Sequence, residues 1–308
     1  MKPLRLQPIP DRTIWGSHHI SDLRKADQNY GTWWEVSAHP YCTNMVINLD
    51  KSLTLQELIE QDPEGLLGPG YTLHELLRLA FLDSKDDLSI QVHPHDAYAL
   101  KHSNDYGKYE SWYIVDAKPN ATLVAGTKTA DPEVIKQALK EGTLDQYLCV
   151  WPVQKGDYIT IPAGMLHALG KDIVALEVGT NSNTTYRFYD YGRKDERGNL
   201  RSLHLKESFD VADFTLKPHF EPAQKESRRI GDTPCFTVDE LYIQKDRKFI
   251  LENSYAIVSN LGEDTAILWG QEEIPICHLE SVFVPYSAQA FTLKKGTHVL
   301  LSQPGRKD

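Results

Sequence analysis

Residues 156–167 read Gly156-Asp-Tyr-Ile-Thr-Ile-Pro162-Ala-Gly164-Met-Leu-His167, and this stretch is the most informative part of the chain. It has the pattern G-x5-P-x-G-x2-H, in which a strand-like run leads into a tight turn at Pro162 and Gly164. A histidine follows directly after the turn. The pattern therefore predicts a strand–turn–strand unit that holds His167 just beyond the turn.

Three segments carry the residues that we expect to bind a metal ion. Gln91 and His93 are two positions apart in a strand-like run, so their side chains leave the same face. Glu110 opens a second predicted strand, and His167 supplies a second imidazole. One amide oxygen, one carboxylate and two imidazoles suit a borderline divalent ion such as zinc and leave coordination open for a substrate. Each residue alone is more often structural or solvated, so this prediction depends on the joint pattern.

The overall composition is that of an ordinary globular protein. The chain has 308 residues, of which 41% are hydrophobic and 25% are charged, and this length allows one large domain or two modest ones. The formal net charge of −10 argues against nucleic acid or an anionic membrane as the main partner. A small anionic substrate remains compatible with this charge, because a local basic pocket can act inside a negative field.

Cysteine usage and the absence of targeting signals predict a cytoplasmic protein. The four cysteines are widely separated and form no C-x-x-C pair, so we expect reduced, structural thiols at Cys42, Cys149, Cys235 and Cys277. The N-terminal sequence has no apolar core of a signal peptide. No window approaches the ~18 apolar residues of a transmembrane helix.

Short strands with turns account for most of the predicted elements. Helices are expected at 54–60, 71–80, 131–142 and 205–212, although the second could run into a strand from residue 76. Strands are expected at 43–49, 88–92, 111–115, 121–125, 158–161, 173–178, 236–239, 248–251, 256–259, 265–268, 281–284, 290–293 and 297–302. This pattern predicts a mainly β fold of jelly-roll or barrel type with a few inserted helices.

The predicted turn unit has a faint second copy downstream, in residues 278–292. An alignment of the two copies places Pro162 on Pro285 but His167 on Ala290. The second copy thus keeps the strand–turn–strand skeleton and loses the ligand.

Two cupin-like β domains follow from this repeat. We expect a metal-containing catalytic domain over residues 1–220 and a degenerate, metal-free domain over residues 230–308. The stretch 217–227 is polar and contains two prolines, so it is predicted to be the linker.

Six segments together resemble the type I mannose-6-phosphate isomerases of the cupin superfamily, in their short bacterial form. They occur in the family's order and lie at residues 14–16, 34–40, 89–94, 107–113, 161–168 and 176–190. The last segment contains Thr-Tyr-Arg-x-Tyr-Asp, which is not expected in a generic cupin. The C-terminal third of the chain resembles the family only in its general sequence pattern and contains none of these segments.

The resemblance implies a cofactor and a set of site residues. One zinc ion per chain would be bound by Gln91, His93, Glu110 and His167. Three further side chains would serve catalysis: Arg187 as an active-site cation, Glu177 as a pocket carboxylate and Lys108 beside the metal. Ser17, residues 178–180 and the pair His95-Asp96 depart from common family residues, which leaves the fine selectivity for substrate open.

The implied reaction is the interconversion of mannose 6-phosphate and fructose 6-phosphate through an enediol. Zinc would stabilise the oxygen charge that develops, and the proton could be carried by Glu177, His95 or a zinc-bound water. Arg187, Arg193 and Lys194 lie on one loop and could bind the phosphate. For the last two, a solvated hairpin turn is the simpler interpretation.

Two alternatives compete with this isomerase. A different metal-dependent cupin enzyme, such as an iron oxygenase, is disfavoured because those sites usually contain more histidines and no glutamine. A catalytically silent sugar-binding cupin is disfavoured because the first domain loses none of its expected ligands.

Overall fold

The computed structural model describes residues 1–194 and 197–306, and most of its regular structure is antiparallel sheet. A seven-stranded sheet has the spatial order β15 (His219–Glu221), β11 (Tyr158–Ile161), β8 (Glu110–Ala117), β13 (Ile173–Thr180), β6 (Leu77–Ser84), β3 (Thr32–Val36) and β2 (Ile9–Asp11). A five-stranded sheet has the order β10 (Leu148–Pro152), β9 (Thr122–Thr127), β12 (His167–Ala168), β7 (Ile90–Val92) and β14 (Tyr186–Tyr189). These two sheets form the first sandwich.

Two further sheets form a second sandwich. The six-stranded sheet has the order β1 (Leu4–Arg5), β22 (Ser281–Val284), β19 (Ala256–Asn260), β24 (His298–Pro304), β17 (Phe236–Tyr242) and β16 (Arg228–Asp232). The four-stranded sheet has the order β18 (Arg247–Ile250), β23 (Ala290–Leu293), β20 (Thr265–Trp269) and β21 (Glu272–Ile276). A short separate ladder pairs β4 (Ala38–His39) with β5 (Cys42–Thr43). The fold is thus mainly β and of the cupin type, as the sequence predicts.

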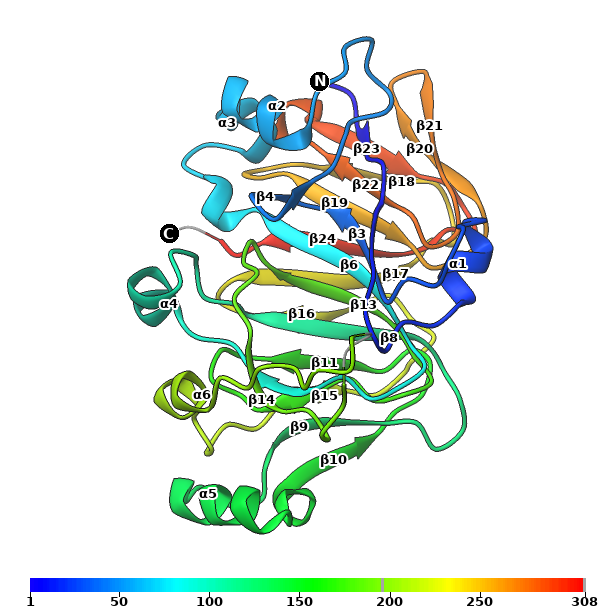
Figure 1. Cartoon of the computed structure of the whole chain (residues 1–308). Coiled ribbons are helices and arrows are strands. Elements are labelled where there is room, and N and C mark those ends of the chain that lie inside the picture. The colour runs from blue at the N-terminus through cyan, green and yellow to red at the C-terminus, as the bar shows by residue number, and fades with distance from the viewer. Residues whose placement is uncertain (195–196, 307–308) are drawn as a thin grey trace.

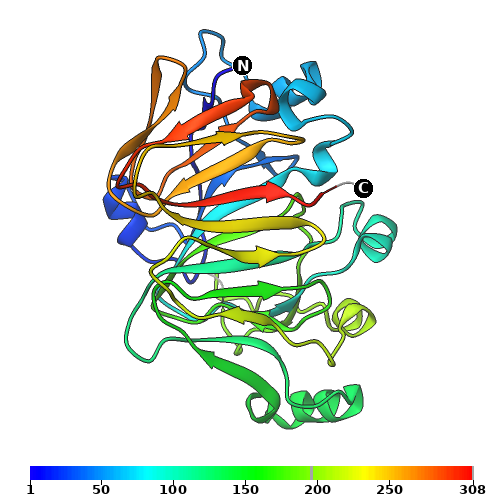
Figure 2. The same ribbon diagram turned by 180° about the vertical axis from the view of Figure 1, so that it is seen from behind.

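The two sandwiches are stacked through their larger sheets, so the sheets lie one above another in Figures 1 and 2. One apolar core fills the space between them and includes Phe81 and Leu176 from the first sandwich and Phe283 and Leu300 from the second. Separate cores fill the inside of each sandwich. The chain's first strand belongs to the second sandwich, because Leu4 pairs with Phe283.

Strand β13 shows how this layering positions the site. Its alternate residues Val174, Leu176 and Val178 pack toward the second sandwich, whereas Ile173 and Ala175 pack inside the first. Because side chains alternate along a strand, position 177 also faces the inside of the first sandwich. The carboxyl group of Glu177 is therefore directed into the interior of the first sandwich, which is otherwise largely apolar.

Helices are short and lie outside the sheets (Figure 1). They are α1 (His19–Leu23), α2 (Leu55–Gln61), α3 (Pro63–Leu67), α4 (Asp96–His102), α5 (Pro132–Glu141) and α6 (Leu205–Val211), with 3₁₀ turns at Leu73–Glu75, Leu144–Tyr147 and Tyr286–Ala288. The predicted caps are present, since Thr54 and Glu57 form a capping box and Asp131 accepts a hydrogen bond from the amide of Glu133. Within the described residues, no helix has the length and apolarity needed to cross a membrane.

Two predicted elements differ from the structure. The helix expected at 71–80 is reduced to one 3₁₀ turn, and the alternative of a strand from residue 76 is confirmed as β6, which is buried on both faces. A strand buried on both faces is apolar at nearly every position, so its leucines imitate a helical period. Residues 43–49 contain little strand, because Val46 pairs with Leu6 and Met45 with Thr54, so successive residues bond to different segments.

The stretch expected as a linker is partly a strand, and the two copies of the expected repeat occupy similar positions in the two sandwiches. Part of the 217–227 stretch is ordered as β15, which pairs with β11 at the edge of the first sandwich. In both sandwiches the repeat begins with a strand of the larger sheet, β11 or β22, and continues after a turn into the smaller sheet, as β12 or β23. His167 and Ala290 each open that second strand. The domain boundaries and the metal-free state of the second domain remain predictions.

Candidate metal centre and active site

Three of the four predicted ligands converge inside the first sandwich. His93 directly follows β7, Glu110 begins β8 and His167 begins β12. The Nε2 atoms of His93 and His167 lie 3.2 Å and 3.3 Å from the two carboxylate oxygens of Glu110. All three side chains are almost fully buried, and their ligand atoms lie within 4.8 Å of one another. This group could hold a metal ion.

Two glycines permit this close packing. Gly164 adopts a left-handed φ of +89° in the turn before His167, and its amide donates a 2.8 Å hydrogen bond to the carbonyl of His93. The turn thereby ties two ligand-bearing segments together. Gly179 lies opposite Glu110 in the ladder, where a Cβ would come 3.4 Å from the Glu110 Cβ.

Backbone carbonyls set the orientation of both imidazoles. The Nδ1 of His93 lies 3.0 Å from the carbonyl oxygen of Thr184, and the Nδ1 of His167 lies 2.8 Å from that of Met165. A carbonyl can only accept, so each Nδ1 carries the proton and each Nε2 presents a lone pair. Both lone pairs are directed into the cluster, which is the arrangement of metal-binding histidines.

The chemistry of this group fits a divalent cation. Among the described residues, neither His93 Nε2 nor either Glu110 oxygen has a hydrogen-bond partner of acceptable geometry, although all are buried. Burial lowers the pKa of His93 to about 4, so its imidazole is neutral at physiological pH. Burial alone would raise the pKa of Glu110, but the charge of Lys108 holds it well below the ordinary value. A cation would satisfy these buried acceptors together.

Gln91 lies beside this group on the same face. Gln91 and His167 are directly opposite in the pairing of β7 with β12, and the amide nitrogen is 3.2 Å from His167 Nε2. Half a turn of the amide exchanges its nitrogen and oxygen. Gln91 can therefore offer an oxygen to an ion bound by the three buried ligands.

Lys108 and Glu177 adjoin the metal group. The ammonium nitrogen of Lys108 lies 2.5 Å from Glu110 and 2.7 Å from Glu177. Burial and then the charge of Glu110 raise the pKa of Glu177. Burial opposes the charge on Lys108, but the two carboxylates raise its pKa above the ordinary value. The site thus combines a permanent cation with a carboxyl group that takes up a proton more readily than usual.

Arg187 belongs to the same row of side chains. It lies opposite Gln91 in the pairing of β14 with β7, and Gln91 in turn lies opposite His167, so all three face one side of the sheet. Its Nη1 donates to the carbonyl of Ser202, whereas its buried Nε has no partner among the described residues. Burial and then the charge of Arg201 lower the pKa of Arg187.

The other cations of this loop have different surroundings. Arg193 and Arg201 both pair with Asp190, and Arg193 also donates to the carbonyl of Asp87. These bonds support the interpretation of Arg193 as a hairpin residue. The exposed Lys194 lines a separate hollow of about 430 Å³.

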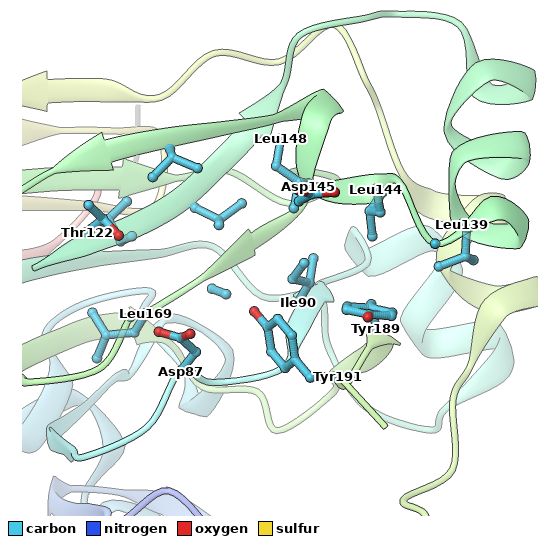
Figure 3. Close-up of a pocket in the computed structure, with 16 residues that line it drawn as sticks. Asp87, Ile90, Thr122, Leu139, Leu144, Asp145, Leu148, Leu169, Tyr189 and Tyr191 are labelled. Carbon is cyan, nitrogen blue, oxygen red and sulfur yellow. The ribbon is translucent and has the colours of Figure 1, made fainter. Parts of the chain in front are cut away.

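A cavity of about 370 Å³ opens beside Lys108 at the junction of the sandwiches. His95 and Thr180 line it from the first sandwich, and Cys235 and Arg306 line it from the second. A second cavity, of about 410 Å³, lies on the outer face of the five-stranded sheet and contains none of the predicted ligands (Figure 3). The cavity beside Lys108 is the one that adjoins the site.

Sequence reasoning missed the residues that support the site. The carbonyls of Thr184 and Met165 orient the imidazoles, and Arg201 stands beside Arg187. Asp105 holds the turn that contains Thr184. No local pattern marks these residues, because a backbone carbonyl is present at every position and Arg201 and Asp105 lie outside the recognisable segments.

Comparisons with known proteins place this site in a family. Residues 5–144 match the model for the type I phosphomannose isomerase catalytic domain. The mannose-6-phosphate isomerase of Streptococcus mutans is 33% identical over 97% of this chain and 92% of its own, and ManA of Bacillus subtilis is 31% identical over 98% of each. The crystal structure of the B. subtilis mannose 6-phosphate isomerase superposes with a TM-score of 0.85 at 26% identity, covering 98% of this chain and 100% of that one. The chain therefore belongs to the type I mannose-6-phosphate isomerase family.

Proposed function

We propose that this chain interconverts mannose 6-phosphate and fructose 6-phosphate through an enediol, with one zinc ion bound by Gln91, His93, Glu110 and His167. The observation that carries the proposal is the buried cluster of His93, Glu110 and His167, in which, among the described residues, the Nε2 of His93 and both Glu110 oxygens have no hydrogen-bond partner of acceptable geometry. Family membership supports the reaction and a small sugar phosphate as substrate.

The donor set suits zinc. Two neutral imidazoles and one carboxylate form a common catalytic zinc set, and Gln91 adds a neutral oxygen. A mannose 6-phosphate isomerase of the same fold has been solved with zinc and yttrium, at 14% identity and a TM-score of 0.72, and that likeness concerns the fold alone. When bound here, zinc would supply Lewis-acid stabilisation of the oxygen charge that develops between aldose and ketose.

We assign the proton transfer to Glu177. Its pKa is raised by burial and by the charge of Glu110, which suits a group that must both accept and return a proton. As a base, its carboxylate removes the C2 proton of the open-chain aldose and gives the proton back at C1, so the carboxyl ends in its starting state. A second proton passes from the hydroxyl on C2 to the oxygen on C1, so that C2 becomes the carbonyl carbon and C1 carries the hydroxyl. The ammonium of Lys108, 2.7 Å away, stabilises the carboxylate when the proton returns to the sugar. His95 is the competing carrier, because it lines the cavity beside Lys108.

We assign an anionic part of the substrate to Arg187. Its guanidinium is half-buried, its Nε has no partner among the described residues, and it shares a sheet face with Gln91. A guanidinium can bind a phosphate through two parallel hydrogen bonds. Arg201 lies close enough to lower the pKa of Arg187, although Arg201 itself pairs with Asp190.

Two measurements on the purified protein test this function. Metal analysis should find one zinc per chain, and a coupled assay should detect fructose 6-phosphate formed from mannose 6-phosphate. Iron in place of zinc would favour a different metal-dependent cupin enzyme. Zinc binding without conversion of the sugar would favour a silent sugar-binding cupin.

A further inference from the structure

The orientation of His93 depends on a turn outside the metal cluster. Its Nδ1 lies 3.0 Å from the carbonyl oxygen of Thr184, in the turn that joins β13 to β14. The same turn connects the strand of Glu177 with the strand of Arg187. A shift of this turn would therefore move the carbonyl that orients His93. It would also change the spacing between Glu177 and Arg187.

Asp105 holds this turn with one carboxylate. Its Oδ2 accepts hydrogen bonds of 2.9 Å from the amide of Asn183 and from the hydroxyl of Thr184. Its Oδ1 accepts a 2.8 Å bond from the amide of Tyr106 and lies 3.2 Å from His39 Nε2. A carboxylate that receives this many donors is fixed in place.

A buried cation holds the turn from its other side. Arg78 is 2% exposed, and its Nη1 donates to the carbonyl of Ser182 and to the side-chain oxygen of Asn183. Its guanidinium also stacks 3.6 Å above the ring of Trp34. Asp105 thus accepts from two donors of the turn and Arg78 donates to two of its acceptors, so the turn is held from both sides.

We propose that Asp105 is a positioning residue of the metal centre, acting through Thr184 to orient His93. The proposal rests on the proposed function, since it requires His93 to bind the metal. Among the described residues, the hydrogen-bond partners of Asp105 include none of the predicted metal ligands, so it acts on His93 through the turn. The Thr184 carbonyl then holds the Nδ1 proton of His93 and keeps its Nε2 lone pair directed at the ion.

The test measures metal affinity in the full-length protein. Asp105→Asn removes the negative charge and replaces one of the two acceptor oxygens by an NH2 donor, so the side chain can no longer accept from both the turn and Tyr106. The zinc dissociation constant, measured by competition with a chelating dye, should rise about 10- to 100-fold, the usual cost of losing an outer partner of a metal-bound histidine. The visible spectrum of the cobalt-loaded variant should change as well, because the imidazole is reoriented.

Asp157→Asn is the matched control. Asp157 is a buried carboxylate of the same sandwich that accepts 2.9 Å bonds from the amides of Gln154 and Ala223. Asp157→Asn should lower the melting temperature of the metal-free protein while leaving the zinc dissociation constant and the cobalt spectrum unchanged. Equal zinc affinities for Asp105→Asn, Asp157→Asn and the wild type would overturn the proposal.

Thr184→Val is an independent test of the same route, and it remains informative if Asp105→Asn does not fold. It removes the hydroxyl that donates to Asp105 but keeps the backbone carbonyl and the side-chain shape. Zinc affinity should fall in the same direction, and the double variant should lose less than the sum of the single losses. Wild-type affinity in Thr184→Val would contradict the route through Thr184.

His93→Ala separates this proposal from the proposed function. If His93→Ala binds zinc like the wild type, the ligand set itself is wrong. If His93→Ala loses zinc but Asp105→Asn does not, only the role of Asp105 fails.

Discussion

Lys108 places its ammonium nitrogen 2.5 Å from a carboxylate oxygen of Glu110, although both side chains are nearly inaccessible to solvent. Glu177 approaches the same nitrogen at 2.7 Å, so two buried carboxylates share one protein cation. The two carboxyl groups nevertheless differ in acidity. The pKa of Glu110 is well below its ordinary value, whereas the pKa of Glu177 is above it. Lys108 thus favours the ionised form of Glu110, while the carboxyl group of Glu177 takes up a proton more readily than usual.

Lys108→Met should destabilise the metal-free protein. Removing one partner of a buried ion pair leaves an uncompensated charge and typically costs about 3–5 kcal/mol. Lys118→Met is the control, since Lys118 pairs with Asp172 at 2.6 Å but is 63% exposed, and its loss should cost less than about 1 kcal/mol. Urea unfolding of both variants measures the difference, and similar losses would contradict the burial argument.

The free energy of unfolding should depend on pH through Glu35. This side chain is 1% exposed, contacts Arg24 at 2.8 Å and accepts a bond from the amide of Ser281 in the second sandwich. Burial raises its pKa from 4.5 to about 6, against the opposing effect of Arg24. Between these values the folded state holds a proton that the unfolded state has lost, so stability falls as pH rises.

The loss of stability is about 2 kcal/mol over the whole transition, from well below pH 4.5 to well above pH 6. Glu35→Gln cannot titrate and should show a flatter profile than the wild type over this window. Urea unfolding at several pH values measures both profiles, and the difference between them isolates Glu35 from other groups. Parallel profiles would show that Glu35 has an ordinary pKa in the folded protein.

Arg187→Lys should lower kcat/KM about ten- to a hundredfold, which corresponds to the loss of a charge-assisted hydrogen bond of about 1.5–3 kcal/mol. Lysine keeps the charge but cannot form the two parallel bonds of a guanidinium. Zinc content and fold should be unchanged. Arg229→Lys is the control, because Arg229 forms a two-bond pair with Asp239 on the surface.

Whether the lower kcat/KM of Arg187→Lys arises from kcat or from KM identifies the role of Arg187. A higher KM with unchanged kcat would indicate phosphate binding in the ground state. A lower kcat would indicate stabilisation of the developing oxyanion near the metal. Wild-type values of both would remove Arg187 from the site.

His167→Ala should lose metal and activity together. This imidazole is fully buried and its Nε2 faces Glu110 at 3.3 Å, so the substitution removes a lone pair that no neighbour replaces. His219→Ala should retain both properties, because His219 is 61% exposed and pairs with Glu221 at the edge of the sheet. Metal analysis and the coupled assay give the two readings. Full zinc occupancy and full rate in His167→Ala would refute the ligand assignment.

Local sequence patterns were sufficient for several parts of this protein. The caps at Thr54 and Asp131 mark helix starts because the interactions that satisfy a helix end lie within a few residues. The turn at Pro162 and Gly164 and the repeat at Pro285 are local as well. The converging ligands were recognisable because their residue types and order resemble those of a family, and the structure brings His93, Glu110 and His167 together.

Tertiary structure decided what the patterns leave open. The sequence left helix and strand both open over strand β6, because burial on both faces removes the alternation that identifies a strand. The first strand of the chain belongs to the second sandwich because its ladder partner lies about 280 residues away, at a distance that no local pattern covers. Asp105, Arg78 and the carbonyl of Thr184 act on His93 through hydrogen bonds between segments distant in sequence. Residue types and spacing thus determined which groups could bind a metal, and only the packing of the sheets determined how those groups are oriented.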